Sequence, residues 1–345
     1  MKWVRTSLVI NLTILLFSCA PPSNSPPVSS SSPQNDGKYD SEFPHTSSTK
    51  ELKAISQVIK KIYSTITYEN HIFNKNRGIK RNEINKQVLK TADDTFESRN
   101  TVLGTATVIH YLNKKIAVLS CAHIFDKPDT IVTFHTNEHD SRGIVQSVAV
   151  KTRQTNVIPD LPGSGEFEIL LMDRKNDIAI LGKEFKRRPT WQINTLEFPF
   201  GSAKELDWGA FVYVFGFPRG FQMLTRAIVS SPENVHKGEF IIDALFNRGM
   251  SGSLVLAIRD GLPNFEVVGI TKSAAAEDLS VLIPEQGKSY DEYIPYEDQV
   301  FVHTQKRINY GITMVITSEV IIELLKNNEK ELRYKGYYID LPGVD

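Results

Sequence analysis

Asn247-Arg248-Gly249-Met250-Ser251-Gly252-Ser253 is the stretch on which the interpretation of the whole sequence depends. It places a serine between two glycines, with a third small residue close by, which is typical of a tight turn that exposes a hydroxyl group. Gly249 lets the backbone bend so that the N–H groups of Gly249 and Ser251 point to one place, as in an oxyanion hole beside a nucleophile. Glycine and serine are common in turns of every kind, so the stretch needs support from elsewhere, and Ser253 is a second candidate nucleophile.

Two residues upstream supply that support. His123 follows the apolar run 118–122, and Asp177 opens the apolar run 178–181. A histidine can take the proton of a serine hydroxyl, and a carboxylate can hold the imidazole in the required tautomer. Of the eight histidines, only His123 has this context. Asp173 is the alternative acid, but it precedes the apolar run instead of opening it.

From about residue 98 onward, short apolar runs alternate with turns. Such a pattern is typical of the strands of a barrel or a sandwich. We expect strands near residues 104–109, 116–120, 131–134, 145–152, 167–172, 178–181, 211–216, 224–229, 240–243, 254–258, 267–271 and 311–316. A helix is expected at about 318–330, followed by a tail at 334–345.

These pieces, in this order, resemble trypsin-like serine proteases of the chymotrypsin fold. The hairpin 104–123 resembles the part that ends at their catalytic histidine, and Asn176-Asp177-Ile178-Ala179-Ile180-Leu181 resembles their aspartate strand. The segments 216–220, 225–230 and 243–252 resemble the second barrel of bacterial HtrA-type proteases, and 310–316 with the following helix resembles their ending. The resemblance covers roughly residues 98–330, and we expect no PDZ domain after it.

The resemblance implies an all-β protein of two six-stranded antiparallel barrels with an N-terminal and a C-terminal helix. It divides the protease domain, 98–333, into a first barrel at about 98–192 and a second at about 196–317. It implies a serine endopeptidase in which Ser251 attacks the peptide carbonyl, His123 transfers protons and Asp177 orients the imidazole. The backbone N–H groups of Gly249 and Ser251 are expected to bind the oxyanion.

The resemblance also implies a substrate pocket that includes Leu245, Thr271, Lys272 and Ser273. An apolar Leu245 at its base favours small or medium apolar side chains at P1, because a buried basic group would lack a partner there. Ser253 stands where the family usually has glycine, so a positive φ at that position would strain the backbone.

The beginning of the chain is expected to direct it to a bacterial cell envelope. A basic start precedes an apolar run at 8–17, and Leu16-Phe17-Ser18-Cys19 resembles the lipobox of bacterial lipoproteins. The resemblance implies a signal peptide at 1–19, a lipid anchor with palmitate on Cys19 and, in a Gram-negative cell, an outer membrane site facing the periplasm. An ordinary signal peptide with an incidental cysteine is the alternative. The Ser/Pro-rich segment 20–48 is expected to be a disordered tether.

After the tether, Ser48-Thr49-Lys50-Glu51 has the spacing of a capping box. The apolar residues that follow recur at helical spacing: Leu52, Ile55, Val58, Ile59, Ile62 and Ile66. They predict an amphipathic helix of about five turns that packs against the protease. The polar and basic residues 70–95 are expected to be a solvated connection, which closes an N-terminal region of 49–97.

Residues 274–308 are expected to lengthen a loop beside the substrate cleft. They carry tyrosines and acids: Tyr290, Asp291, Tyr293, Tyr296, Glu297 and Asp298. A surface insertion without function and a lid or partner-recognition loop are equal alternatives.

The composition limits the other functions. Forty basic and forty acidic residues cancel, which does not favour nucleic acid as a partner. Two cysteines, Cys19 and Cys121, are too few for a disulfide framework. The sequence has no metal-ligand spacing and no phosphate-binding glycine loop, so we expect no cofactor and no metal. The expected partners are protein or peptide substrates, and the membrane through the lipid.

Two other classes stand beside the endopeptidase. One is a catalytically silent binding module with a protease fold, displayed on the membrane. The other is a structural lipoprotein in which the triad pattern is accidental. The complete set of His123, Asp177 and Ser251 argues against the first, and the order of the matching pieces argues against the second.

Overall fold

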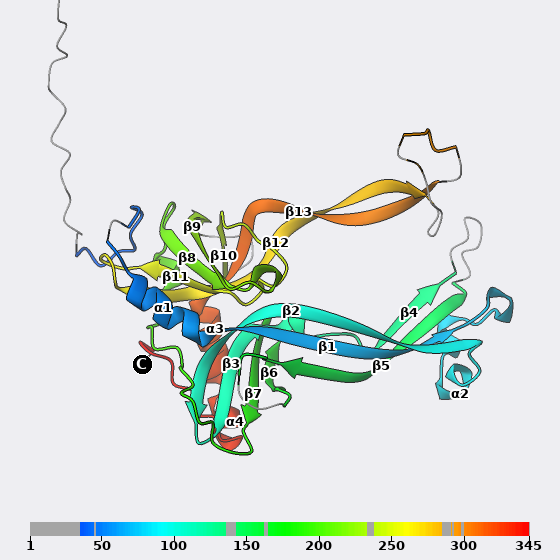
Figure 1. Cartoon of the computed structure of the whole chain (residues 1–345), viewed down its shortest axis with the longest axis horizontal. Coiled ribbons are helices and arrows are strands. Elements are labelled where there is room, and N and C mark those ends of the chain that lie inside the picture. The colour runs from blue at the N-terminus through cyan, green and yellow to red at the C-terminus, as the bar shows by residue number, and fades with distance from the viewer. Residues whose placement is uncertain are drawn as a thin grey trace, which may run out of the picture. The chain divides into compact units, whose positions relative to one another are not determined.

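The structure is a computed structural model that describes residues 35–44, 46–135, 143–161, 165–232, 238–284, 291, 293–297 and 300–344 (Figure 1). The predicted signal peptide, Cys19 and most of the predicted tether lie outside these residues, as do Tyr290 and Asp298. Residues from 35 onward belong to one structural unit. Within the described part, no helix has both the length and the apolar character needed to cross a membrane.

The first half of the chain forms a seven-stranded antiparallel sheet with the spatial order β4-β5-β1-β2-β3-β7-β6. Its strands are β1 (Ile59–Ile72), β2 (Asp94–Leu112), β3 (Lys115–Cys121), β4 (Thr130–Phe134), β5 (Val145–Val157), β6 (Glu168–Asp173) and β7 (Ile178–Glu184). The sheet brings β3 next to β7, and these are the strands that adjoin His123 and Asp177.

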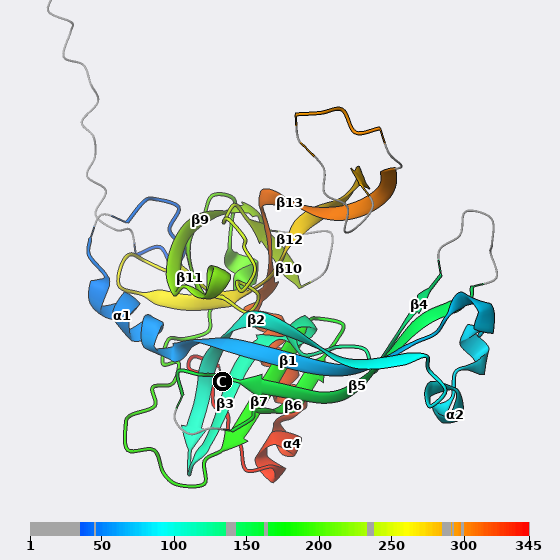
Figure 2. The same cartoon turned by 45° about the vertical axis from the view of Figure 1, so that its right-hand side comes forward.

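The second half forms a closed six-stranded barrel with the order β10-β13-β12-β11-β8-β9 (Figure 2). Its strands are β8 (Phe211–Gly216), β9 (Met223–Ser231), β10 (Glu239–Ile242), β11 (Leu254–Ile258), β12 (Phe265–Pro284) and β13 (Val300–Thr317). The predicted all-β fold in two barrel-like halves is therefore confirmed. The first half has seven strands instead of six, because a segment predicted as helix contributes β1.

Hydrophobic packing joins the two halves at strand β8, which is buried along its whole length. Successive side chains of a strand point to opposite faces. Phe211, Tyr213 and Phe215 join a core shared with the first sheet, whereas Val212 and Val214 join a second core of barrel residues. Because β8 is apolar on both faces, the barrel and the first sheet pack as one body around a common core.

The C-terminal helix is confirmed. It consists of α3 (Ser318–Asn327) and α4 (Glu329–Tyr334), which follow the last barrel strand. Ile321, Leu325 and Leu332 are buried in the shared core. Tyr337 and Leu341 of the predicted tail are also buried there, so this part of the tail packs against the body.

The predicted five-turn helix over 49–66 is wrong in its second half. α1 spans Thr49–Val58, and the chain continues directly as β1. β1 is rich in isoleucine, threonine and tyrosine, which favour strands over helices. Since β1 pairs with β2 and β5, the region 49–97 is not separate from the first sheet.

The predicted solvated connection at 70–95 also differs from the structure. It contains the end of β1, the short helix α2 (Lys86–Leu89) and the start of β2. Phe73 is buried in a small cluster with Val145 and Val148 of β5. This cluster gives the far end of the first sheet a core of its own.

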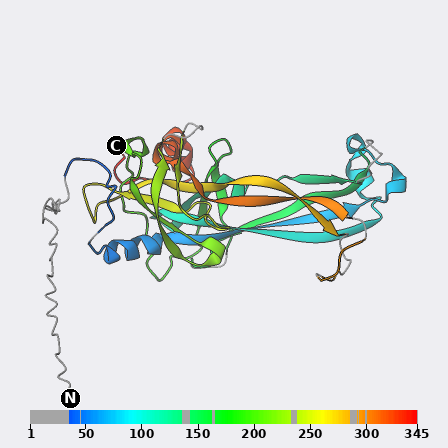
Figure 3. The same ribbon diagram turned by 90° about the horizontal axis from the view of Figure 1, so that it is seen from above.

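The predicted long loop at 274–308 is largely a two-stranded ribbon. β12 and β13 continue beyond the barrel and pair from Ala276↔Ile308 to Pro284↔Val300. Figure 3 shows the ribbon extending away from the other barrel strands. Several of its apolar side chains are exposed, among them Leu282 and Val302, which face each other across the ribbon.

Candidate active site

His123 lies in a short 3₁₀ turn that follows β3. Ala122 and Ile124 on either side of it are buried and fix the turn in the shared core. The imidazole itself stays accessible, with 45% of the side chain exposed. The local packing therefore presents an open imidazole on a rigid support.

Asp177 lies immediately before β7, where its backbone takes a left-handed conformation with φ of 62°. This conformation is uncommon for residues other than glycine, and Asn and Asp tolerate it best. The side chain is only 10% exposed. The backbone carbonyl of Asp177 accepts a hydrogen bond from the N–H of Ala122 at 3.1 Å, which connects the aspartate to the histidine turn.

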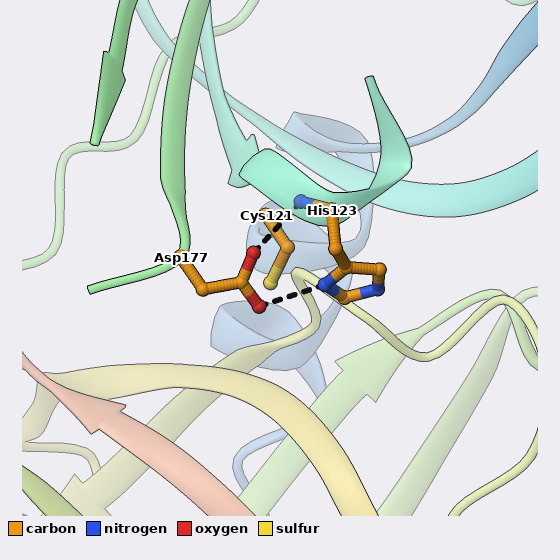
Figure 4. Close-up of side chains that lie close together, drawn as sticks. All are labelled: Cys121, His123 and Asp177. Carbon is orange, nitrogen blue, oxygen red and sulfur yellow. Dashed lines mark hydrogen bonds and ion pairs between the residues drawn. The ribbon is translucent and has the colours of Figure 1, made fainter. Parts of the chain in front are cut away.

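The carboxylate of Asp177 binds His123 at two points (Figure 4). Its Oδ1 accepts from the backbone N–H of His123 at 2.7 Å, and its Oδ2 lies 2.7 Å from the imidazole Nδ1. On the other side of the ring, Nε2 lies 2.9 Å from the hydroxyl of Ser251. The structure thus brings the three predicted residues into one chain of hydrogen bonds, in the order Asp, His, Ser.

Ser251 lies in a tight turn just before β11. Gly249 (φ 100°) and Gly252 (φ 84°) both take the left-handed region that favours glycine. A Cβ atom at Gly249 would collide with the carbonyl oxygen of Phe217, and one at Gly252 would collide with that of Thr105. The turn that places the hydroxyl beside Nε2 of His123 therefore requires both glycines.

The two N–H groups predicted to form an oxyanion hole are available. Within the described part of the chain, neither the N–H of Gly249 nor that of Ser251 has a hydrogen-bond acceptor. Their neighbours are held, because Met250 donates to Asn247 at 3.0 Å and Gly252 donates to Thr271 at 2.8 Å. Two unengaged donors beside a serine hydroxyl can receive a developing negative charge.

A comparison with known families and solved structures can be set beside this geometry. Residues 104–270 match the family model of the trypsin-like peptidase domain. The matched residues include His123, Asp177 and Ser251.

Among solved structures, the chain is similar to a serine endoprotease from Yersinia pestis. The identity is 15%, the match covers 85% of this chain and 68% of that one, and the TM-score is 0.41. It is also similar to kallikrein-related peptidase 10 in a complex with Zn²⁺, with 10% identity over 66% of this chain and 90% of that one and a TM-score of 0.34. No curated protein matches the chain.

Two of the four predicted pocket residues, Leu245 and Thr271, differ in their exposure to solvent. Leu245 is 59% exposed, so its side chain is open to a substrate. Thr271 is wholly buried, and its hydroxyl donates to the carbonyl of Met250 at 2.6 Å. Thr271 therefore supports the turn that carries Ser251.

The other two predicted pocket residues already have partners. The ammonium of Lys272 forms an ion pair with Glu239 at 2.8 Å, in which the carboxylate is largely buried. The hydroxyl of Ser273 donates to the sulfur of Met314 at 3.8 Å. Since Glu239 balances its charge, Lys272 does not act as a free cation for an acidic P1 group.

The alternative acid and the alternative nucleophile form hydrogen bonds with groups other than the imidazole. Asp173 ends β6 and accepts from the backbone N–H groups of Lys175 and Asn176 at 3.0 and 3.1 Å. The hydroxyl of Ser253 is fully buried and points to the hydroxyl of Thr105 at 3.4 Å. The strain expected at Ser253 does not arise, because Gly252 takes the positive φ instead.

Cys121 lies near the side chains of His123 and Asp177 (Figure 4). The possible ligand atoms of Cys121, His123 and Asp177 lie within 4.8 Å of one another, which is compatible with a metal ion. A metal would need a thiolate. Burial, followed by the charge of Asp177, raises the pKa of the Cys121 thiol, and its sulfur donates to the carbonyl of Thr271 at 3.3 Å. In this arrangement Cys121 is therefore a neutral thiol that is hydrogen-bonded to the backbone beside the imidazole.

Sequence reasoning did not identify Thr105 as part of the site. This fully buried residue of β2 donates its backbone N–H to the carbonyl of Ser251 at 2.8 Å and its hydroxyl to the carbonyl of Gly249 at 2.7 Å. The available signal was a polar residue inside the otherwise small and apolar strand Gly104-Thr105-Ala106-Thr107-Val108-Ile109. Thr107 in the same strand gives an identical signal, so the sequence could not single out Thr105.

Proposed function

We propose that the chain is a serine endopeptidase. The observation that carries the proposal is the hydrogen-bonded series from Asp177 through His123 to the hydroxyl of Ser251, at 2.7 and 2.9 Å. The trypsin-like peptidase domain at 104–270 supports it. Each residue of the series is a group that acyl transfer requires, and each lies within hydrogen-bond reach of the next.

In this mechanism, Nε2 of His123 takes the proton of Ser251 as the serine oxygen forms a bond to the substrate carbonyl carbon. The carbonyl oxygen becomes an oxyanion, which the N–H groups of Gly249 and Ser251 stabilise. The imidazolium then gives its proton to the leaving amine as the peptide bond breaks. Water, deprotonated by the same imidazole, releases the acyl group and restores the serine.

Asp177 makes this proton transfer possible by its position. Because its Oδ2 lies next to Nδ1 of His123, the neutral imidazole carries its proton on Nδ1 and leaves Nε2 free to accept. The second bond, from the His123 backbone to Oδ1, prevents the carboxylate from rotating away. The charge of Asp177 stabilises the imidazolium that forms.

The substrate preference proposed is for small or medium apolar side chains at P1. The exposed leucine at position 245 offers an apolar contact and no charge for a basic side chain. Cleavage of a peptide library should therefore be dominated by apolar P1 residues. A library profile dominated by Arg or Lys would refute this preference.

We further propose an HtrA-type protease tethered to the bacterial envelope by a lipid on Cys19. The support is the lipobox-like Leu16-Phe17-Ser18-Cys19 and the Ser/Pro-rich segment that follows it. Several acyl chains on one cysteine give firm membrane binding, whereas one chain gives only marginal binding. Cys19→Ser should move the protein out of the membrane fraction or leave it uncleaved. Unchanged fractionation, with no lipid mass on the mature N-terminus, would reject the anchor.

The test of the proposed function is hydrolysis of casein by the full-length protein and two serine variants. Ser251→Ala should fold normally by circular dichroism and lose roughly four orders of magnitude in kcat, because triad residues act as a unit. Ser253→Ala should keep most of the activity. Loss only in Ser253→Ala, or a folded Ser251→Ala that still cleaves, would overturn the assignment. A wild-type protein that does not cleave would favour the silent binding module.

A further inference from the structure

We propose that Thr105 is a positioning residue that holds the oxyanion donor Gly249 in its productive orientation. The proposal rests on the proposed endopeptidase function and adds to it a residue outside the triad and the oxyanion hole. Thr105 belongs to the first sheet, whereas Gly249 belongs to the barrel. Its hydroxyl therefore crosses from one half of the molecule to the other.

Thr105 forms hydrogen bonds through both its side chain and its backbone. Its hydroxyl donates to the carbonyl of Gly249 at 2.7 Å and accepts from the backbone N–H of Phe217 at 2.9 Å. Its backbone N–H donates to the carbonyl of Ser251 at 2.8 Å, and its own carbonyl accepts from the hydroxyl of Ser120 at 2.7 Å. All of these groups surround the turn of the nucleophile.

A second bond holds the other side of Gly249. The backbone N–H of Arg219 donates to the carbonyl of Arg248 at 2.7 Å. The backbone of Arg219 takes a left-handed conformation with φ of 53°. In a planar trans peptide, the C=O and the N–H point in opposite directions. Fixing the carbonyl of Arg248 therefore also fixes the direction of the Gly249 N–H.

Both carbonyls that flank the Gly249 α-carbon are thus engaged. This matters because glycine rotates more freely about its backbone bonds than any other residue. A larger residue could not restrict this freedom, since a Cβ atom at Gly249 would collide with the carbonyl of Phe217. The orientation of the donor must come from hydrogen bonds to the two flanking peptides. Arg219 holds the carbonyl of Arg248, and the peptide after Gly249 is held by the N–H of Met250, which donates to Asn247, and by Thr105, which supplies the bond that comes from a side chain.

The consequence of losing the hydroxyl follows from this arrangement. Without it, the carbonyl of Gly249 and the N–H of Phe217 both lose their partner in a buried place. The peptide after Gly249 then keeps only the bond from the N–H of Met250, and rotation of this peptide about the Gly249 α-carbon moves the Gly249 N–H from its direction toward the oxyanion. Removing an oxyanion donor costs roughly 10² to 10³ in kcat, so misdirecting it should cost a substantial part of that.

Thr107 provides a matched control in the same strand. Like Thr105 it is fully buried in β2, but its hydroxyl has no hydrogen-bond partner among the described residues. Thr107→Val therefore makes the same chemical change, a hydroxyl to a methyl group, at a similar depth without removing a hydrogen bond. It should leave kcat and KM close to those of the wild type.

The test measures kcat and KM for a peptide substrate on the full-length protein. Thr105→Val should lower kcat roughly ten- to hundredfold with KM nearly unchanged, because only the transition state carries the oxyanion. Thr105→Ser, which keeps the hydroxyl, should restore kcat to within about threefold of the wild type. A Thr105→Val enzyme with the same kcat as Thr107→Val, or a Thr105→Ser enzyme as slow as Thr105→Val, would overturn the role.

A further variant keeps the test decisive should Thr105→Val not fold. Thr105→Cys has nearly the size of Thr105→Ser but offers only a weak donor. We expect its kcat to fall about tenfold below that of Thr105→Ser, and equal values would contradict the proposal. Wild-type protein without activity would overturn the endopeptidase and the positioning role together. An active wild-type protein whose Thr105 variants all have the wild-type kcat would overturn the positioning role alone.

Discussion

Asp177 owes its position beside the imidazole to a backbone conformation that few residue types accept. Its φ of 62° lies in the left-handed region, where Asp and Asn are several-fold enriched over other residues with a side chain. This conformation turns the carboxylate toward both the backbone and the ring of His123. Asn is therefore the substitution that best separates the charge of Asp177 from its backbone geometry.

Asp177→Asn should fold normally and lose about four orders of magnitude in kcat. The amide keeps the backbone conformation, but it can donate to Nδ1 and so favour the imidazole tautomer that cannot accept the serine proton. Peptide hydrolysis with circular dichroism as the folding control measures this. An Asp177→Asn enzyme within tenfold of the wild type would show that the carboxylate does not set the tautomer.

Cys121 should resist alkylation in the native protein. Burial raises the pKa of its thiol, and a raised pKa means that less of the reactive thiolate is present at any given pH. Iodoacetamide at pH 8 should leave Cys121 unmodified in the folded protein and modify it fully in denaturant, as read by peptide mass spectrometry. Rapid native modification of Cys121, with activity lost in step, would indicate an accessible thiolate beside His123.

Among the structural elements, β1 is a strand that the spacing of apolar residues in the sequence wrongly predicted as helix. Ile59, Ile62 and Ile66 fit a helical spacing, yet Ile62 and Ile66 also fit a strand in which alternate residues are buried. Ser64, between them, is wholly buried and accepts from the side chain of Gln154 at 3.2 Å. Because Ser64 is polar, the sequence does not show that every second residue here is buried. Its hydrogen-bond partner, Gln154, belongs to β5, which the local sequence does not reveal.

The strands around the candidate site were easier to predict than β1. The runs that became β3, β7, β8 and β11 are mostly apolar because these strands are buried on both faces. The turn at Gly249 and Gly252 was also readable, since its glycines are required by close backbone approach. The role of Thr105 was not, because it depends on contacts between two halves of the chain more than a hundred residues apart.

Backbone amides should exchange hydrogen more slowly in β1 than in the ribbon of β12 and β13. Residues 63–72 of β1 pair with strands on both sides. Among the described residues, the ribbon at 276–284 pairs only with 300–308. Amides in β1 should therefore exchange at least about tenfold more slowly than those in the ribbon, measured by mass spectrometry of peptides from each segment. Exchange of β1 as fast as that of the ribbon would contradict its central place in the sheet.

At the scale of the whole molecule, the segment before β1 connects the two halves. Tyr39 donates its hydroxyl to Glu266 of the barrel at 2.7 Å, and the guanidinium of Arg259 lies over its ring at 4.1 Å. Farther along, Ile55 and Val58 of α1 are buried in the core shared with the first sheet. The segment 36–58 therefore reaches both parts of the body on which the candidate site is built.

Removing this segment should destabilise the protein. Burial of Ile55 and Val58 contributes about 3 to 6 kcal/mol, which corresponds to a fall in Tm on the order of 10 °C for a chain that begins at residue 59. A chain that begins at residue 35 should keep the Tm of the full-length protein, and one that begins at residue 46 should lie between the two. Thermal unfolding followed by circular dichroism measures all three. Equal Tm values for the chains beginning at 35 and at 59 would show that the segment is not part of the stable body.

The central claim is that the assembled molecule activates the hydroxyl of Ser251, and a fluorophosphonate probe tests this most directly. Such a probe reacts with a serine whose proton an adjacent base can remove. The full-length protein should be labelled, with the added mass mapped by peptide mass spectrometry to Ser251. Ser251→Ala and His123→Ala should both remain unlabelled while folded. A folded wild-type protein that takes up no label, or takes it up on another serine, would contradict the account.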